Sequence, residues 1–234
     1  EDLSAQVCEE IELTQAKEDF RFFVFNNSQE LIVDPSQNPL KYLAGADIRN
    51  GINPLANKLV FKRAFFRGAE EEITCEELKH LMFHQARSYF LAGLWPTTFD
   101  LAVTLAGLLI SVSYGDNSDV DKPGFLGAHF KEFLPPLHTK KLKAKVIEPK
   151  LIASHRNNAG LSPKEAQQRF YDTIRENCVA FGTIPYPASC VRFGDKKVKG
   201  KVYLAVGCEG VHILNANDLS VISFLQFSRL KGWN

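Results

Sequence analysis

The sequence predicts an α+β protein built from three successive lobes. Residues 1–68 combine one helical segment with short strand-like runs, residues 69–178 show helical periodicity, and residues 179–234 hold short β-branched or aromatic runs separated by turns. A chain of 234 residues is long enough for two or three small lobes. We therefore expect a mixed lobe, then a helical lobe, then a β lobe.

Composition places the chain among globular proteins. It is 45% hydrophobic with a formal net charge of +1, which fits neither a disordered tail nor a general nucleic-acid binder. The five cysteines are scattered and form no CxxC pair, so we expect reduced thiols in a cytosolic protein and no zinc cluster. The longest apolar run, 101–112, is interrupted and falls short of the roughly 20 residues that span a bilayer. The chain begins without Met or a signal-like segment, so we expect a piece of a longer protein.

The first lobe should contain one helix and several short strands. Leu3, Val7 and Ile11 recur at a spacing of four, which predicts a helix within residues 1–13. The aromatic run at 20–25, the short apolar run at 31–33 and the run at 59–66 each predict a strand.

The second lobe should contain at least three helices. Apolar residues in 74–93 follow helical spacing, and Gly93 and Pro96 should end that helix. A second helix should open at Thr97, which has capping-box spacing to Asp100, and close at Gly115. A third should start at 162–165, where Ser, Pro and Glu occupy the cap, the first turn and the third position.

The third lobe should be a meander of antiparallel strands. The runs at 203–206, 211–214 and 221–227 are β-branched or aromatic, and the segments 207–210 and 215–218 between them have turn composition.

No catalytic pattern is found in the sequence. His80 and His84 are four residues apart, but the segment reads HLMFH, which lacks the glutamate of a zinc-protease helix and an evident third ligand. Neither GxSxG, GxxxxGK[ST] nor GxGxxG occurs. We therefore expect no enzymatic activity, no metal site and no cofactor.

Two clusters of basic residues remain for a binding role. Lysines near an anionic leaflet contribute about 1 kcal/mol each, so such clusters suit reversible membrane contact. The alternative is that both are solvated loops. Nucleic acid is not expected as a partner, because acids nearly balance bases and basic residues do not alternate with aromatic ones. The clusters are Lys140, Lys141, Lys143, Lys145 and Lys150, and Arg192, Lys196, Lys197, Lys199 and Lys201.

Six short motifs occur in order along the chain. They are LVFKRAFF at 59–66, HQARSYFLAG at 84–93, LAGLL at 105–109 with YGD, GFL and FLP after it, GLSPKEA at 160–166, VGCEGVHI at 206–213 and LKGW at 230–233. Each motif alone is weak, whereas six in register extend over essentially the whole chain. Together with the order of the segments, they resemble the FERM domain.

The resemblance implies a three-lobe fold. Residues 1–68 would be a ubiquitin-like lobe that lacks its opening hairpin, and residues 69–178 a helical lobe like acyl-CoA-binding protein. Residues 179–234 would be a PH/PTB-like lobe that lacks its last strands and closing helix. The traits are shared with talin-like heads, with Krev-interaction-trapped adaptors and with myosin-tail FERM domains.

The resemblance also implies two kinds of site. In PTB-like lobes a partner peptide adds a strand beside the fifth strand, here 221–230, unless these side chains belong to the core of the lobe. In talin-like relatives the loop that joins the first strands of this lobe faces lipid, and the lysines at 140–143 are a weaker addition. The peptide candidates are Ile222, Phe224, Phe227 and Leu230, and the lipid candidates are Lys196, Lys197, Lys199, Lys201, Lys140, Lys141 and Lys143.

The function implied is a non-catalytic adaptor at the plasma membrane, cell cortex or junctions. It would bind cytoplasmic tails of membrane proteins, scaffold proteins or a Rap-type small GTPase, with phosphoinositide contact. The alternative is a regulatory or cargo-binding FERM segment of a kinase, phosphatase or myosin. A third option is an acyl-ligand-binding protein that uses a cavity between the helices of residues 74–115.

Overall fold

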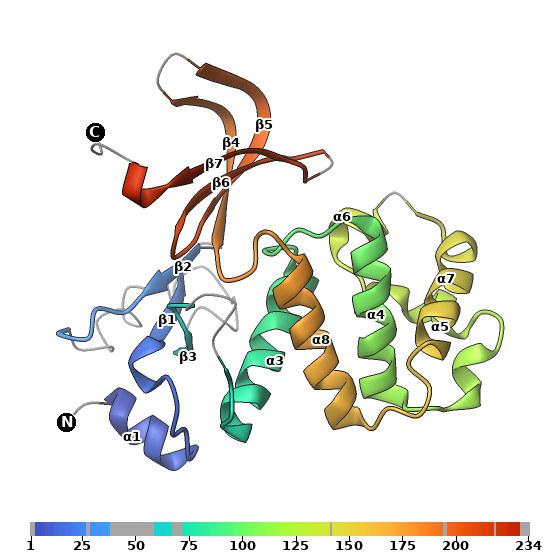
Figure 1. The fold of residues 1–234 in the computed structure, drawn as a ribbon. Coiled ribbons are helices and arrows are strands. Elements are labelled where there is room, and N and C mark those ends of the chain that lie inside the picture. The colour runs from blue at the N-terminus through green and yellow to red at the C-terminus, as the bar shows by residue number, and fades with distance from the viewer. Residues whose placement is uncertain are drawn as a thin grey trace, which may run out of the picture. The chain divides into compact units, whose positions relative to one another are not determined.

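A computed structural model describes residues 3–26, 29–37, 59–66, 72–140, 142–193, 196–217 and 219–229 (Figure 1). The chain divides into two compact units. The first comprises Glu1–Phe66 and Glu72–Gln85, and the second comprises Arg67–Glu71 and Ala86–Asn234. Each unit is described by itself.

The first unit contains helix α1 (Leu3–Glu10) and a three-stranded antiparallel sheet. The aromatic strand β1 (Phe20–Asn26) lies at its centre, between β2 (Gln29–Ile32) and β3 (Val60–Arg63). The predicted helix and all three predicted strands are confirmed. The core of this unit contains apolar side chains that are no more than 4% exposed, namely Cys8, Leu13, Phe20, Phe23, Val24, Val33, Leu78, Met82 and Phe83.

A buried ion pair fixes the end of β3, where the sequence shows only a basic–aromatic run. The guanidinium of Arg63 donates to the carboxylate of Asp19 at 2.6 Å, and both side chains are at most 7% exposed. The side-chain amide of Gln85 on α3 (Glu76–Ala92) forms hydrogen bonds with the backbone N–H and C=O of Arg63, at 3.0 and 2.8 Å. Buried charges need such complete pairing, so this cluster holds the strand and the helix together.

The helical part of the second unit is organised around α4 (Phe99–Tyr114). Residues 105–111 of α4 are all buried, because α4 packs against α7 (Ala144–Arg156) and also against α8 (Pro163–Asn177). A helix that is apolar around most of its circumference belongs in such a central position. Two short helices, α5 (Phe125–His129) and α6 (Pro136–Thr139), complete the arrangement (Figure 1).

The helix boundaries largely follow the predicted caps, with one correction. Ser162 and Glu165 form the predicted capping box of α8, and Gly115 ends α4 with φ 57°. The prediction that Thr97 caps α4 is wrong. The cap is Thr98, whose hydroxyl accepts a hydrogen bond from the backbone N–H of Leu101, whereas Thr97 is buried.

Three helices, α5, α6 and α7, were not predicted from the sequence. Both α5 and α6 span five residues or fewer, too few for a periodic pattern. Helix α7 contains Pro149, which the sequence rules treat as a breaker. Glu148 of α7 accepts hydrogen bonds from the backbone N–H groups of Gly124 and Gly127 at 2.8 and 2.9 Å, so one helix caps the start of another.

The second unit ends in a four-stranded antiparallel sheet with the order β4-β5-β6-β7. The strands are β4 (Ile184–Phe193), β5 (Lys196–Val206), β6 (Gly210–Asn215) and β7 (Val221–Gln226). The three predicted strands are confirmed; residues 207–209 separate β5 from β6, and the described residues 216 and 217 follow β6 as a turn. β4 and the first half of β5 were not predicted, because prolines interrupt β4 and lysines dominate the start of β5.

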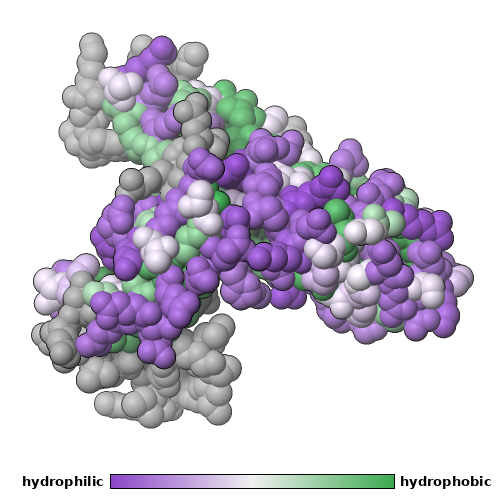
Figure 2. Space-filling model, turned by 60° about the horizontal axis from the view of Figure 1, so that its bottom comes forward, coloured by the Kyte–Doolittle hydropathy of each residue, from purple (hydrophilic) through white to green (hydrophobic). Residues whose placement is uncertain are grey.

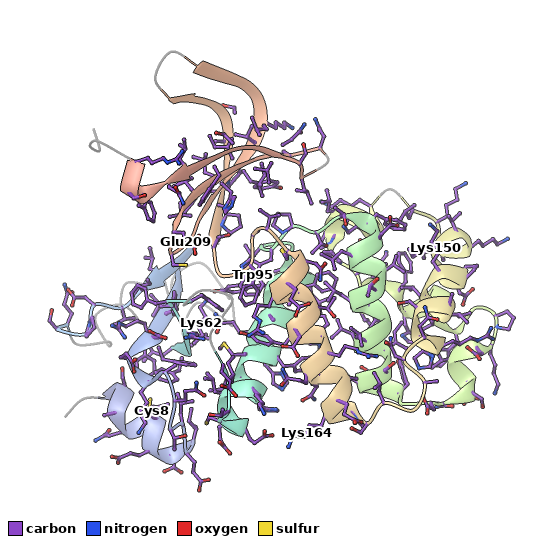
Figure 3. The ribbon with its side chains drawn as sticks, viewed as in Figure 1. Cys8, Lys62, Trp95, Lys150, Lys164 and Glu209 are labelled. Atoms are coloured by element: carbon purple, nitrogen blue, oxygen red, sulfur yellow. The ribbon has the colours of Figure 1, made fainter. Side chains whose placement is uncertain are left out.

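A tryptophan joins the helical part of this unit to the segment before β4 (Figure 3). Trp95 is 1% exposed, and its indole N–H donates to the carbonyl oxygen of Thr183 at 3.0 Å. Its ring contacts Tyr89 and Phe181, with ring centroids 4.9 and 4.8 Å apart. The thiol of Cys178 lies 3.6 Å from the carbonyl oxygen of Pro96 in the same cluster. This cluster anchors the chain between α8 and β4 within the second unit.

The surface of the helical part is largely hydrophilic in the view of Figure 2, with apolar side chains in small groups. Among the residues that the structure describes, none of the helices has the length and hydropathy required to cross a bilayer.

Candidate functional site

The first candidate site is the outer edge of β7. Within the described residues β7 is the last strand of its sheet and pairs with β6 on one side only. The backbone groups on its other side are therefore available to an added strand. The resemblance assigned 221–230 to a fifth strand; the described sheet instead makes Val221–Gln226 its fourth strand.

The side chains of β7 are more exposed than a core strand would be. Val221 is 49% exposed, Ile222 42% and Phe224 37%, so the alternative that assigned Ile222 and Phe224 to the core is wrong. Phe227 follows in a 3-10 turn (Phe227–Arg229) and is half-buried. Leu230, the fourth peptide candidate, lies outside the described residues.

The side chain of Phe224 packs against a residue of the neighbouring strand β6. Its ring stacks on that of His212, directly opposite in the register, with centroids 4.2 Å apart and planes 20° apart. Burial lowers the pKa of His212, and the charge of Glu209 opposes that shift only in part. The imidazole is therefore neutral near pH 7 and serves as a flat surface that holds Phe224 at the edge.

The opposite edge of the sheet is less suited to strand addition. In the part of the sheet that the structure describes, β4 pairs only with β5, and it carries Pro185 and Pro187, each of which lacks a backbone N–H. Prolines are one of the devices that prevent edge pairing. The two edges therefore differ in their proline content, and β7 contains none.

The basic residues lie on several different elements. Lys196, Lys197, Lys199 and Lys201 belong to strand β5, which corrects the expectation that they form a loop; Lys201 is exposed. In the other cluster Lys140 and Lys143 are exposed at the two ends of the connection from α6 to α7. Lys141 lies outside the described residues.

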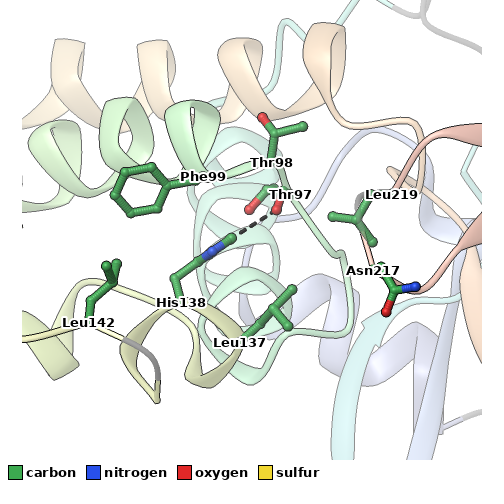
Figure 4. Close-up of a pocket in the computed structure, with 8 residues that line it drawn as sticks. All are labelled: Thr97, Thr98, Phe99, Leu137, His138, Leu142, Asn217 and Leu219. Atoms are coloured by element: carbon green, nitrogen blue, oxygen red, sulfur yellow. Dashed lines mark hydrogen bonds between the residues drawn. The ribbon is translucent and has the colours of Figure 1, made fainter.

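A second candidate site is a pocket of about 310 Å³ within the second unit (Figure 4). Its residues come from three segments: the connection from α3 to α4, helix α6 with the chain after it, and the turn between β6 and β7. We call it the Phe99 pocket. Sequence reasoning missed it, because no local pattern connects segments so far apart. It is lined by Thr97, Thr98, Phe99, Leu137, His138, Leu142, Asn217 and Leu219.

No constellation suited to catalysis is found among the described residues. The rings of His80 and His84 are 4.4 Å apart on α3, but the described part of the chain contains no group of three or more His, Cys, Asp or Glu that could hold a metal. Two histidines supply only half of a tetrahedral zinc site.

Comparison with known proteins identifies the fold. Residues 69–183 match the family model of the FERM central domain. Talin-A of Dictyostelium discoideum is 25% identical over 210 residues, which is 86% of this chain and 8% of that protein. Talin-1 of Gallus gallus is 31% identical over 119 residues, which is 50% of this chain and 4% of that protein. The chain thus spans only a small part of these relatives.

Solved structures extend the likeness beyond the central lobe. The C-terminal MyTH4-FERM domain of human myosin 7b, in complex with the harmonin-a PDZ3 domain, superposes with a TM-score of 0.74 at 14% identity, over 100% of this chain and 48% of that one. The complex of the FERM and C-terminal domains of Drosophila Merlin gives 0.67 at 20% identity, over 96% and 72%. The chain therefore carries a FERM fold, in which residues 69–183 match the FERM central domain.

Proposed function

We propose that this chain is a non-catalytic adaptor that binds an extended segment of a partner protein along the edge of β7. The partners that fit are cytoplasmic tails of membrane proteins, scaffold proteins and small GTPases of the Rap type, at the cell cortex. The observation that carries the proposal is an edge strand with two exposed apolar side chains, Ile222 and Phe224, on a sheet whose other edge contains prolines.

The physical basis is strand addition. The backbone of the partner would pair with the free side of β7, and alternate side chains of the partner would contact Ile222 and the supported ring of Phe224. Backbone pairing supplies affinity for any extended chain, whereas the side-chain contacts select among sequences. Similar solved structures support a protein-binding role in general, since the myosin 7b domain is in complex with a PDZ domain and the Merlin FERM domain with the Merlin C-terminal domain.

The test places a photo-reactive amino acid at Ile222 and, as a control, at Val179. Both side chains are similarly exposed, at 42% and 45%, but Val179 lies outside the sheet. We expect partners from a cortical cell extract to crosslink from position 222 and not from position 179. A segment identified in this way should then slow hydrogen exchange at the backbone amides of 221–226. Binding that leaves these amides unprotected would refute the proposal.

Lipid contact is a second part of the proposal, and Lys201 with its neighbours on β5 supports it. Lys196, Lys197, Lys199 and Lys201 occur within six residues at the start of one strand. Charge reversal of these four lysines should weaken co-sedimentation with phosphoinositide-containing vesicles at physiological salt, because each lysine contributes about 1 kcal/mol at an anionic surface. Unchanged co-sedimentation would remove the lipid claim.

A role within a larger motor is the alternative. It is favoured by the match to kinesin-like protein KIN-14I of Oryza sativa, which is 27% identical over 180 residues, 74% of this chain and 14% of that protein. In that setting the same β7 edge would dock cargo or the motor itself. The sequence that flanks the chain in its full-length protein distinguishes the two settings.

A further inference from the structure

The Phe99 pocket has a polar floor and apolar walls. Thr97 at the floor is 2% exposed, Phe99 and His138 are half-buried, and Leu137 at the rim is 37% exposed. Its volume of about 310 Å³ is at the lower end of the ~300–1,000 Å³ found for small-molecule sites, so it suits one large side chain better than a cofactor. Figure 4 shows His138 reaching up between Phe99 and Thr97.

The tautomer of His138 follows from its hydrogen bond. Nε2 lies 2.9 Å from the carbonyl oxygen of Thr97, and a carbonyl can only accept, so Nε2 carries the proton. Burial lowers the pKa of His138 more strongly than this bond raises it, so the ring is neutral near pH 7. Nδ1 is then a hydrogen-bond acceptor, and within the described residues we find no donor for it.

The walls favour an aromatic occupant. The ring of Phe99 lies edge-on to that of His138, with centroids 5.8 Å apart, and Leu137, Leu142 and Leu219 provide the remaining apolar contacts. An apolar body with one donor at its tip complements this lining. Tyrosine has that form, and it is enriched among the residues that dominate protein interfaces.

Lysines around the rim favour a negatively charged partner. Lys143 follows Leu142 directly and is exposed, as is Lys140. The ammonium of Lys150 lies 4.9 Å from the centroid of the Phe99 ring. Two carboxylates, Asp100 and Asp218, adjoin lining residues in the sequence, and Asp218 lies outside the described residues; the three lysines outnumber them. Such a cationic rim attracts carboxylates that flank the inserted side chain.

The backbone at Leu219 is strained in a way that serves the pocket. Leu219 has φ 63°, in the left-handed region that a bulky residue rarely adopts. Its N–H donates to the carbonyl oxygen of Asn215 at 2.8 Å, which fixes the turn. Strain of this kind persists where the surroundings require it, often at ligand-binding sites. Here it places a leucine in the pocket wall.

We propose that the Phe99 pocket receives a tyrosine side chain from an acidic segment of a partner protein. The phenol hydroxyl donates to Nδ1 of His138, and carboxylates next to the tyrosine pair with Lys140, Lys143 and Lys150. This site is separate from the β7 edge and does not depend on it. A recessed pocket lined by His138 fits a side chain better than the flat surface of an anionic membrane.

The test uses two acetylated, amidated pentapeptides, Asp-Glu-Tyr-Asp-Glu and Asp-Glu-Phe-Asp-Glu, titrated onto the whole chain and followed by NMR. They differ only in the phenol hydroxyl. We expect the tyrosine peptide to bind about three- to tenfold more tightly, the range that one net hydrogen bond provides. His138→Phe should abolish this difference, and His129→Phe, a matched change outside the pocket on α5, should preserve it.

Further variants test the same pocket in case the His138→Phe variant does not fold. Leu219→Asn removes an apolar wall but suits the left-handed backbone, so it should weaken both peptides without loss of the fold. Lys140→Glu with Lys143→Glu should weaken both peptides, whereas Lys164→Glu, at the exposed start of α8, should not. Equal affinity of the two peptides for the unaltered chain would overturn the proposal. It would also fail if phosphatidylserine vesicles bind through Lys140 and Lys143 while neither peptide binds.

Discussion

Two adjacent threonines at the start of α4 have opposite energetic roles. The hydroxyl of Thr98 accepts a hydrogen bond from the N–H of Leu101 at 3.4 Å, and so satisfies one donor at the helix terminus. The Thr97 hydroxyl is buried and has no hydrogen-bond partner in the described part of the chain. Both residues precede the same apolar pattern, so the sequence alone could not assign the cap.

This assignment predicts unequal effects of substitution. Thr98→Ala should lower the free energy of unfolding by about 1 kcal/mol, the usual cost of losing a cap. Thr97→Val should leave it unchanged or raise it, because an unpaired buried hydroxyl is replaced by a methyl group of similar shape. Urea denaturation of the two variants measures both values. A larger loss for Thr97→Val would restore Thr97 as the cap.

The ion pair between Asp19 and Arg63 should be among the most sensitive points of the first unit. Asp19→Ala removes the carboxylate that pairs with a guanidinium only 1% exposed, and we expect a loss of about 3–5 kcal/mol in denaturation experiments. The control is Glu76→Ala, which breaks an exposed pair with Lys79 and should cost about 0–1 kcal/mol. Equal losses would show that burial does not control the energy of these pairs.

At the scale of elements, the close contact between α4 and α7 depends on a glycine, Gly107, because a larger residue there would not fit. A Cβ atom at Gly107 would contact the Ser154 hydroxyl and lie 2.8 Å from the Ser154 carbonyl carbon. The Ser154 hydroxyl itself donates to the carbonyl oxygen of Val103 at 3.0 Å, which joins the two helices. Gly107 interrupts an apolar run in the sequence, yet its role is to allow close approach.

Gly107→Ala should therefore destabilise the protein although alanine favours helices. Forcing α4 and α7 apart costs about 1–3 kcal/mol, against a gain of at most about 1 kcal/mol in helix propensity. Gly127→Ala is the matched control, because the nearest atoms to its added Cβ are 3.4 Å away at the end of the Glu148 side chain. Thermal unfolding compares the two. A Gly107→Ala variant as stable as the unaltered chain would contradict this account.

The elements that the sequence predicted are those with strong local patterns. α3, α4 and α8 have long apolar stripes or clear caps, and the strands 20–25 and 221–227 are aromatic and β-branched. α7 was missed because Pro149 lies within it, and β4 because of its prolines. The β7 edge could be anticipated from the family resemblance, whereas the Phe99 pocket depends on tertiary contacts between distant segments, which no local pattern encodes.

At the scale of the whole molecule, the second unit depends on the cluster around Trp95. Cys178 belongs to this cluster and is 6% exposed, and burial raises the pKa of its thiol to about 12. Hydrogen bonds from the backbone of Ala180 and Phe181 oppose that shift only in part. The thiol must therefore stay protonated while the unit is folded, which couples the packing of this cluster to pH.

The sign of this coupling predicts how the free energy of unfolding changes at alkaline pH. An unperturbed cysteine ionises near pH ~8.5, so the folded state holds its proton at a pH where the unfolded chain releases it. The stabilisation is complete below pH ~8.5 and is lost as the pH rises toward 12.

The unaltered chain should lose up to about 1.4 kcal/mol per pH unit more than Cys178→Ala between pH ~9 and ~11. Urea denaturation at a series of pH values measures the difference in slope, and Cys208→Ala, at an exposed turn, should keep the slope of the unaltered chain. Equal slopes for the unaltered chain and Cys178→Ala would mean that the Trp95 cluster admits a thiolate, and so that it is not closed around Cys178.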